Sequence, residues 1–376
     1  MEMVAGQLEK VCKVEFKTFE TSVAILQRAG YNFPSPIPWV DQDSDSAITF
    51  IKQPSQRDKR LLLASERFRI LLVKYPGSAD KQALTEFPKD HDESELYKQQ
   101  SVLDAARERG WFSEHFDAFI KNDTAGSAVL ESPNSFKLVA QTPKDDNYPF
   151  FSLSLSQRFT DTYRPNANWE CIIFVRPATF WEDRVEPMLC RDPFPRDFVD
   201  PMLPDLFVLP VVLLRCQVEQ IMEEVTAMKR KLVEQDEDVI DRGIDELKRI
   251  RNELFALRKK NLFLRRRCEF AVELSQNLAQ SFGILERRVS TEDEVVKYSP
   301  TLVARVANQQ AILKNVLGDL DTTASMSESQ QKFINNQIIA TFAQRDNTSL
   351  KIIAAVTLIF LPGTFVAVRI YLVADH

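Results

Sequence analysis

The sequence predicts a mixed N-terminal domain, α+β or α/β, followed by long antiparallel helices and a stalk helix that runs into one membrane-type helix. Three observations predict this class. Strand-like apolar runs fall within the first 200 residues, and prolines crowd the span from Pro177 to Pro210. Beyond that span the pattern is almost wholly helical, and it ends in 17 uncharged residues from Ile352 to Val368. We therefore expect an N-terminal domain over 1–200, a helical hairpin over 201–290, a stalk helix over 299–351 and a single membrane segment over 352–373.

The N-terminal domain is expected to alternate short helices and strands. Periodicity and turn residues predict helices and strands in this order: a helix over Val11–Arg28, strands over Ala47–Ile51 and Arg69–Val73, a helix over Ser101–Lys121 and a strand over Phe136–Val139.

Two further runs predict a hairpin. From Phe150 to Phe159, apolar residues alternate with serines, which is typical of a strand with one face buried. The run from Glu170 to Val175 is continuously apolar, as in a strand buried on both faces. A loop that contains Pro165 joins them.

The proline-rich span excludes a long helix and marks a domain boundary or a connector. After it we expect one helix over Val211–Glu234, an acidic turn over Gln235–Asp241 and a second helix over Ile240–Arg288. The second helix carries a heptad-like stripe, interrupted by Asn261, which consists of Leu247, Ile250, Leu254, Leu257, Leu264 and Cys268. A basic run flanks the stripe and is expected to be a solvated face: Arg258, Lys259, Lys260, Arg265, Arg266 and Arg267.

The stalk helix has a clear start signal, because Ser299 can cap it and Pro300 fits its first turn. Its middle, Asp321–Asn336, is mostly Thr, Ser, Gln and Asn. Taken alone, that composition favours a loop. In a bundle of helices the same residues could line a hydrated axis.

The uncharged segment Ile352–Val368 is at the lower limit for crossing a hydrocarbon core of about 30 Å. Arg345 and Lys351 precede it, which suits a cytoplasmic flank, and Arg369 can reach the headgroups. A buried soluble helix is the alternative, but Pro362-Gly363 within an apolar run favours a membrane helix. We expect a membrane protein whose residues 1–351 are cytoplasmic, since the N-terminus has no apolar signal.

Composition argues against several classes. With 48 basic and 54 acidic residues and a net charge of −6, the chain is not expected to bind nucleic acid. Nine glycines form neither GxGxxG nor GxxxxGK[ST], and five cysteines and three histidines form no zinc or nucleophile motif. We expect reduced thiols, no tightly bound cofactor and no enzymatic activity.

The segment Asp346–Ala367 resembles the stalk-to-membrane junction of CorA-type magnesium transporters, and Ile359–Ala367 is similar to the form found in the fungal branch. The likeness is close over about 22 residues and architectural over Val211–Asn347. It implies a pentamer with a cytoplasmic α/β domain and stalk helices around an axis, with Mg²⁺ or another divalent cation as the transported or regulatory ion. Matching positions imply axis-facing residues at Asn347, Leu350, Leu361 and Thr364 and an apolar gate at Ile353.

The chain departs from that family after Ala367. The family carries Gly-Met-Asn there, followed by a second membrane helix, whereas this chain continues with nine residues from Val368 to His376. The resemblance therefore implies a C-terminally truncated member with an incomplete pore. The alternative is a non-transporting membrane-anchored scaffold or regulatory subunit. We expect the last nine residues to reflect a gene-model or splicing error.

Two further expectations concern ligands and partners. Clustered carboxylates near the tip of the helical hairpin are predicted to bind divalent cations weakly, unless they form a solvated turn: Glu223, Glu224, Glu234, Asp236, Glu237, Asp238 and Asp241. The stalk carries apolar positions on more than one face, which one helix pair cannot cover. We therefore expect a closed homo-oligomer, with five copies if the resemblance holds.

Overall fold

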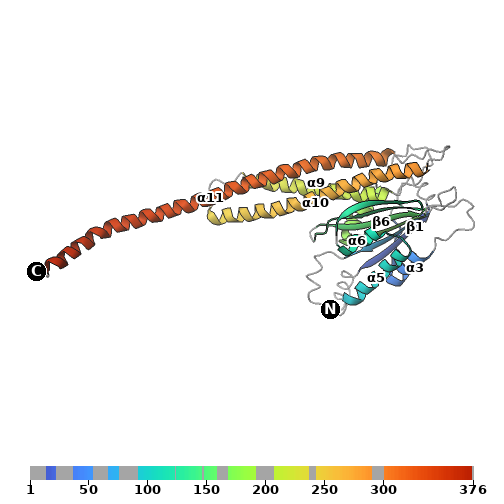
Figure 1. The fold of residues 1–376 in the computed structure, drawn as a ribbon, viewed down its shortest axis with the longest axis horizontal. Coiled ribbons are helices and arrows are strands. Elements are labelled where there is room, and N and C mark those ends of the chain that lie inside the picture. Colours follow the sequence, from blue (N-terminus) through green and yellow to red (C-terminus); the bar gives the residue numbers. More distant parts are fainter. Residues whose placement is uncertain are drawn as a thin grey trace, which may run out of the picture. The chain divides into compact units, whose positions relative to one another are not determined.

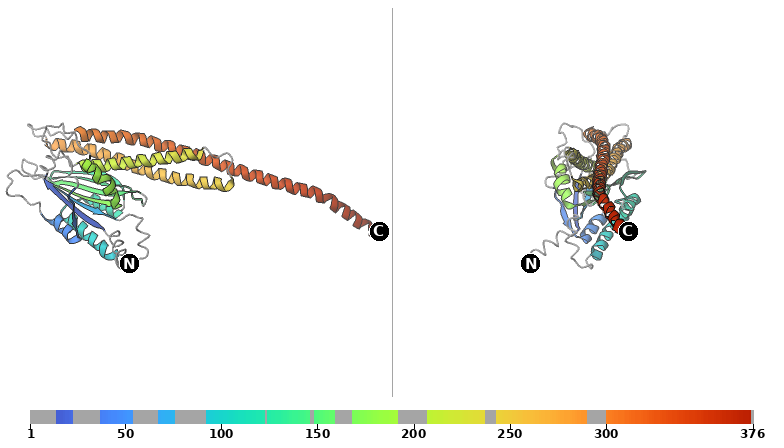
Figure 2. Two further views of the ribbon diagram at one scale, coloured as in Figure 1. Left: turned by 180° about the vertical axis from the view of Figure 1, so that it is seen from behind. Right: turned by 90° about the vertical axis from the view of Figure 1, so that its left-hand side faces the viewer.

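The computed structural model describes most of the chain, namely residues 14–22, 37–53, 67–75, 92–122, 124–145, 148–158, 168–191, 207–236, 243–289 and 300–374. Contacts divide the chain into two units. Unit 1 comprises 1–222 and 265–317, and unit 2 comprises 223–264 and 318–376. The helices α9 (Val208–Asp236), α10 (Ile244–Val289) and α11 (Pro300–Ala374) each contribute to both units (Figures 1 and 2).

Unit 1 is built on a mixed sheet. Its described strands follow the order β2-β1-β3-β7-β6-β5-β4. The strands are β1 (Glu15–Ser22), β2 (Val40–Gln42), β3 (Arg67–Lys74), β4 (Gly126–Ser132), β5 (Ser135–Gln141), β6 (Phe150–Arg158) and β7 (Asn168–Arg176). Strands β3 and β7 are parallel, with Leu71 opposite Ile172, and the other neighbours are antiparallel.

Helices cover both faces of this sheet. One face packs on α3 (Ser44–Lys52), α5 (Asp92–Glu108) and α6 (Glu114–Asn122), around a core that includes Trp111 and Phe116 (Figure 1). The other face meets α9 and α10, where Phe151 contacts Phe270 edge-on. Because both faces are covered, the central strands are buried throughout.

Burial on both faces corrects one prediction. We expected the serine side of β6 to face solvent, but Ser152, Ser154 and Ser156 are buried. The Ser154 hydroxyl donates to the Trp111 carbonyl at 3.1 Å, and that of Ser156 donates to the Glu170 carbonyl at 3.3 Å. Small side chains let the helix layer approach the sheet, and backbone carbonyls replace the water that the hydroxyls of Ser154 and Ser156 lose.

Two secondary-structure predictions in this unit are wrong. The described part of Val11–Arg28 is strand β1 rather than helix, because it pairs along its length with β3. Ala47–Ile51 lies in helix α3 rather than in a strand. The Asp43 side chain accepts from the Ser46 amide at 2.8 Å, which is an N-cap, and Ala47 and Ile51 share the buried face. The rest of Val11–Arg28 lies outside the described residues.

Other predictions are confirmed or refined. The strands β3, β5, β6 and β7 and the β6–β7 hairpin lie where expected. The single helix expected over Ser101–Lys121 is two helices, α5 and α6, separated at Gly110, whose φ of 73° lies in the left-handed region. The described part of the proline-rich connector, up to Arg191, contains three short helical segments: α7 (Ala178–Phe180), the π-helical η3 (Trp181–Val185) and α8 (Glu186–Arg191).

The long helices agree well with the sequence. α9 and α10 match the expected hairpin, and α11 begins at Pro300 as its start signal indicated. The acidic turn between α9 and α10 lies mostly outside the described residues. The polar middle, Asp321–Asn336, is helical throughout.

Candidate functional site

The long helices pack through seams with heptad spacing. One set of buried positions on α10 runs the length of the helix at intervals of three and four residues: Leu247, Ile250, Leu254, Leu257, Asn261, Leu264, Cys268, Ala271, Ser275, Leu278, Phe282 and Leu285. The same spacing holds on α11 for Leu302, Val306, Gln309, Leu313, Val316, Leu320, Thr323 and Ser327. This pattern is the signature of coiled-coil packing, and it confirms the stripe predicted on α10.

Asn261 interrupts the apolar seam and fixes how α10 meets α11. Its side-chain amide donates to the Leu320 carbonyl at 2.9 Å, in a buried position of unit 2. A polar group at a seam position favours the one register that gives it a partner. In this antiparallel register, Phe255 of α10 lies level with Met326 of α11.

The neighbours of α11 in unit 2 lie on two different flanks. On one side, Lys229 of α9 pairs with Asp319 at 2.6 Å, and Gln330 donates to the Leu232 carbonyl at 3.1 Å. On the other side, Arg258 of α10 lies close enough to help lower the pKa of Glu328, for which Lys332 is the main cause.

The polar middle of α11 contributes to the seam and to the surface. Thr323 and Ser327 are buried within it, and the Thr323 hydroxyl donates to the Asp319 carbonyl of its own helix at 2.6 Å. Between the two flanks runs an exposed row that we call the polar row: Thr322, Ser325, Ser329, Lys332 and Asn336. Identical copies around an axis could line a wet channel with such a row.

Beyond Ile338, α11 continues with mostly exposed side chains as far as they are described, to Leu358. From Ile339 to Leu358 the described side chains are half-buried at most, and most are exposed. The predicted axis positions Asn347, Leu350 and Ile353 are exposed, whereas the side chains of Leu361 and Thr364 lie outside the described part. In the part of the chain that the structure describes, no helix combines the length and the apolar character needed to cross a membrane.

The predicted cation site is described only in part. Glu223, Glu224 and Glu234 lie on α9, and Glu224 forms an ion pair with Lys260 at 2.5 Å. The side chain of Asp236, and Glu237, Asp238 and Asp241 altogether, lie outside the described residues. Within the described residues, no group of three or more His, Cys, Asp or Glu side chains is placed to hold a metal ion. Cation binding at this tip stays a prediction.

The basic run of α10 is not uniformly solvated. Lys260 is half-buried beside Glu224, and Arg267 is fully buried. The Arg267 guanidinium donates to Oε1 of Gln217 at 2.6 Å, to Oε1 of Gln220 at 3.0 Å and to the Pro149 carbonyl at 3.1 Å. The sequence gave no signal of this role, because the partners of Arg267 lie about 50 to 120 residues away along the chain.

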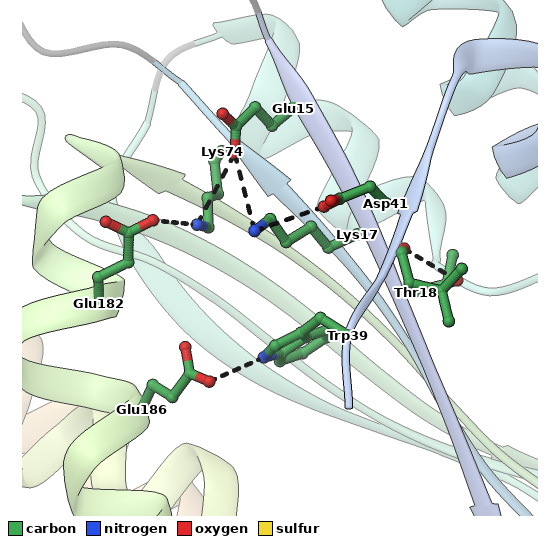
Figure 3. Close-up of polar contacts among 9 residues, drawn as sticks. Glu15, Lys17, Thr18, Trp39, Asp41, Lys74, Glu182 and Glu186 are labelled. Carbon is green, nitrogen blue, oxygen red and sulfur yellow. Dashed lines mark hydrogen bonds and ion pairs between the residues drawn. The ribbon is translucent and has the colours of Figure 1, made fainter. Parts of the chain in front are cut away.

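Sequence reasoning also missed a charged cluster in unit 1, at the end of the β1–β3 pair where Glu15 lies opposite Lys74 (Figure 3). The Lys74 side chain is 2% exposed, and its ammonium pairs with Glu182 of η3 and lies 3.8 Å from Oε2 of Glu15. Lys17 lies 3.4 Å from Asp41, and Trp39 donates its indole proton to Glu186 at 3.3 Å. The cluster holds η3 and α8 against the sheet.

Within the cluster, the two ammonium groups each lie beside carboxylates. Burial alone would lower the pKa of Lys17, but the carboxylates of Asp41 and Glu15 outweigh burial and raise it. Each ammonium already has carboxylate partners, so the arrangement is that of a structural tie.

Three of the four described thiols are buried, and Cys190 is half-buried. Cys171, Cys190, Cys216 and Cys268 form no disulfide. Burial raises the pKa of Cys171 well above its usual value, and it raises the pKa of Cys216 and Cys268 to about 12. A nucleophilic role would need the thiolate, which these sites disfavour.

Comparisons with known proteins give a likeness in structure. No model of a known protein family matches the chain, and no curated protein matches it. Among solved structures, the chain is similar to the soluble domain of CorA from Methanocaldococcus jannaschii, with 10% sequence identity and a TM-score of 0.37. The alignment covers 86% of this chain and 96% of that one.

Proposed function

We propose that this chain is a subunit of a CorA-like divalent-cation transporter, and that α11 lines the axis of its homo-oligomer. The observation that carries the proposal is the polar row of α11. It is exposed along the described helix between two neighbours, α9 and α10, and the helix then continues into the segment that resembles the CorA junction.

The C-terminal part of α11 lacks packing partners within its own chain over the described side chains. A helix whose side chains are exposed over the twenty residues from Ile339 to Leu358 gains little stability from its own chain. Exposed apolar residues in that stretch, such as Ile339, Phe342 and Ile353, gain stability when other copies or lipid cover them. Copies gathered around an axis would cover them and turn the polar row inward.

The remaining parts of the proposal follow the resemblance. Five copies form the oligomer, residues 352–373 enter the membrane, residues 1–351 lie in the cytoplasm, and Mg²⁺ is the transported or regulatory ion. Val368 and the residues after it stand where the family carries Gly-Met-Asn, so the proposed pore is incomplete in this chain. We propose no enzymatic activity for it.

A second candidate is a membrane-anchored scaffold or regulatory subunit that assembles without conducting. The same departure after Ala367 favours it, because the missing signature forms the mouth of the family's pore. Proteoliposomes that contain an Mg²⁺-sensitive dye separate the two candidates. Flux above that of empty vesicles supports the transporter, and a stable oligomer without flux supports the scaffold.

Cysteine cross-linking tests the axis directly. We expect Ser329→Cys, on the polar row, to form disulfide-linked dimers upon oxidation, because copies of one residue meet around an axis. The matched control is Ala256→Cys, which is exposed on the side of α10 away from α11 and should form no disulfide-linked dimer, as judged on a denaturing gel. Equal cross-linking at both positions, or none at Ser329, contradicts an axial α11.

A further inference from the structure

Two apolar surfaces of unit 2 lie exposed on opposite flanks of α11. The first is on α10, where Phe255 is 64% and Leu262 58% exposed. The second is on α11 and α9, where Phe333 is 47%, Met326 40% and Val233 51% exposed. Single exposed apolar residues are common, but these recur at heptad spacing on continuous helices.

The first surface, which we call the α10 flank, consists of Arg251, Phe255, Arg258 and Leu262. These residues follow one another at intervals of four, three and four, so they form one row on α10. Arg258 lies on the side of α10 that faces Glu328 of α11, which places the whole row beside α11. The row alternates arginine with an apolar side chain.

The second surface, which we call the α9 flank, consists of Val233, Met326 and Phe333. Met326 and Phe333 follow Asp319 at intervals of seven residues, and Asp319 pairs with Lys229. Val233 is four residues after Lys229, on the same side of α9. The α9 flank therefore lies on the opposite side of α11 from the α10 flank.

The two flanks also lie at the same level along the helices, and the segments that carry them have opposite net charges. Phe255 and Met326 are level, because the Asn261–Leu320 hydrogen bond fixes the register. Within unit 2, residues 244–264 of α10 carry six basic and three acidic side chains. Residues 223–236 and 318–338, which include the α9 flank, together carry four basic and seven acidic ones.

We propose that the α10 flank of one copy binds the α9 flank of the next copy in a parallel arrangement. Such a contact joins two different surfaces, so it is heterologous and closes into a ring around the polar row. This inference rests on the proposed assembly and assigns its subunit interface. It predicts which side chains hold the ring together, with Phe255 and Phe333 packed near its centre.

The test uses the full chain in detergent. We expect Phe255→Ser and Phe333→Ser each to weaken self-association by roughly 100-fold, as for a buried aromatic at an interface centre. Both side chains are exposed within one chain, so the helical content measured by circular dichroism should stay unchanged. Val40→Ser, at an exposed apolar residue of β2, is the matched control and should associate normally.

Mixing the two variants tests the heterologous contact. The intact α9 flank of the Phe255→Ser copy fits the intact α10 flank of the Phe333→Ser copy, so differently tagged variants should form mixed dimers and stop there. Loss of association without mixed dimers overturns the heterologous contact. Normal association of either variant overturns the assigned surfaces but leaves the proposed assembly intact, whereas a monomeric wild-type chain overturns both.

Discussion

Replacing Arg267 by Met tests how the buried hydrogen bonds of unit 1 stabilise it. Met retains much of the side-chain volume but removes three hydrogen bonds, to Gln217, Gln220 and the Pro149 carbonyl. Hydrogen bonds to a charged group contribute about 1.5–3 kcal/mol each, and losing a buried partner leaves acceptors without one. Removal of the desolvated charge offsets part of this loss.

The expected net loss is about 3–5 kcal/mol in the free energy of unfolding, at the upper end for a single substitution. It is measured by urea denaturation, followed by circular dichroism and by the intrinsic fluorescence of the tryptophans of unit 1. Arg266→Met is the matched control, since Arg266 is exposed next to Arg267, and it should change stability by less than about 0.5 kcal/mol. Equal losses in the free energy of unfolding for the two substitutions would refute the claim that the hydrogen bonds of Arg267 stabilise unit 1.

Three further predictions concern the helices and the thiols. Gly318→Ala should raise stability by about 0.5–1 kcal/mol in thermal melts, since an added Cβ meets open space on α11, and a loss would mean that the glycine is needed there. Asn261→Leu should leave the free energy of unfolding unchanged or raise it by about 1 kcal/mol, whereas Asn261→Asp should lower it by about 3 kcal/mol or more, because it buries a charge. If urea denaturation shows the Leu variant to be less stable than the Asp variant, the placement of Asn261 in the buried seam is contradicted. Cys216 and Cys268 should resist alkylation at pH 8 until the protein unfolds, as mapped by mass spectrometry, and rapid labelling of the native protein would contradict their burial. Because the pKa values of both thiols are raised in the folded state, the stability that they contribute is complete below about pH 9 and declines as pH rises towards about 12.

The helical half of the chain was largely predictable, because its signals are local. Pro300 starts α11 where a first-turn proline is tolerated, and the seam of α10 follows the heptad spacing that the sequence shows. Even Asn261, read as an interruption, lies in the seam and gains a carbonyl partner there.

The sheet domain was less predictable because its determinants are distant in sequence. β1 contains mixed polar and apolar residues, and pairing with β3 makes it a strand. The Asp43 cap was a local signal for α3 that the strand prediction overlooked. The serines of β6 gave the expected alternation, but the helices that cover them could not be inferred from that strand.

In the candidate site too, features set by local sequence could be predicted, and features set by distant partners could not. The polar row could be anticipated from composition, since Asp321–Asn336 is rich in Thr, Ser, Gln and Asn. The charged contacts of Lys74 and the hydrogen bonds of Arg267 could not be anticipated, because the partners of these two residues lie about 50 to 120 residues away along the chain. The predicted positions Leu361 and Thr364 and the acidic tip stay predictions.

The mass of the detergent-solubilised chain tests the proposed assembly most directly. Light scattering, corrected for bound detergent, should give a closed oligomer, at five times the chain mass of 43.2 kDa if the resemblance holds. The mass should stay constant across micromolar concentrations, because a closed ring does not grow. A particle of 43.2 kDa at every concentration, with the stalk still helical by circular dichroism, would contradict both the assembly and the axial α11.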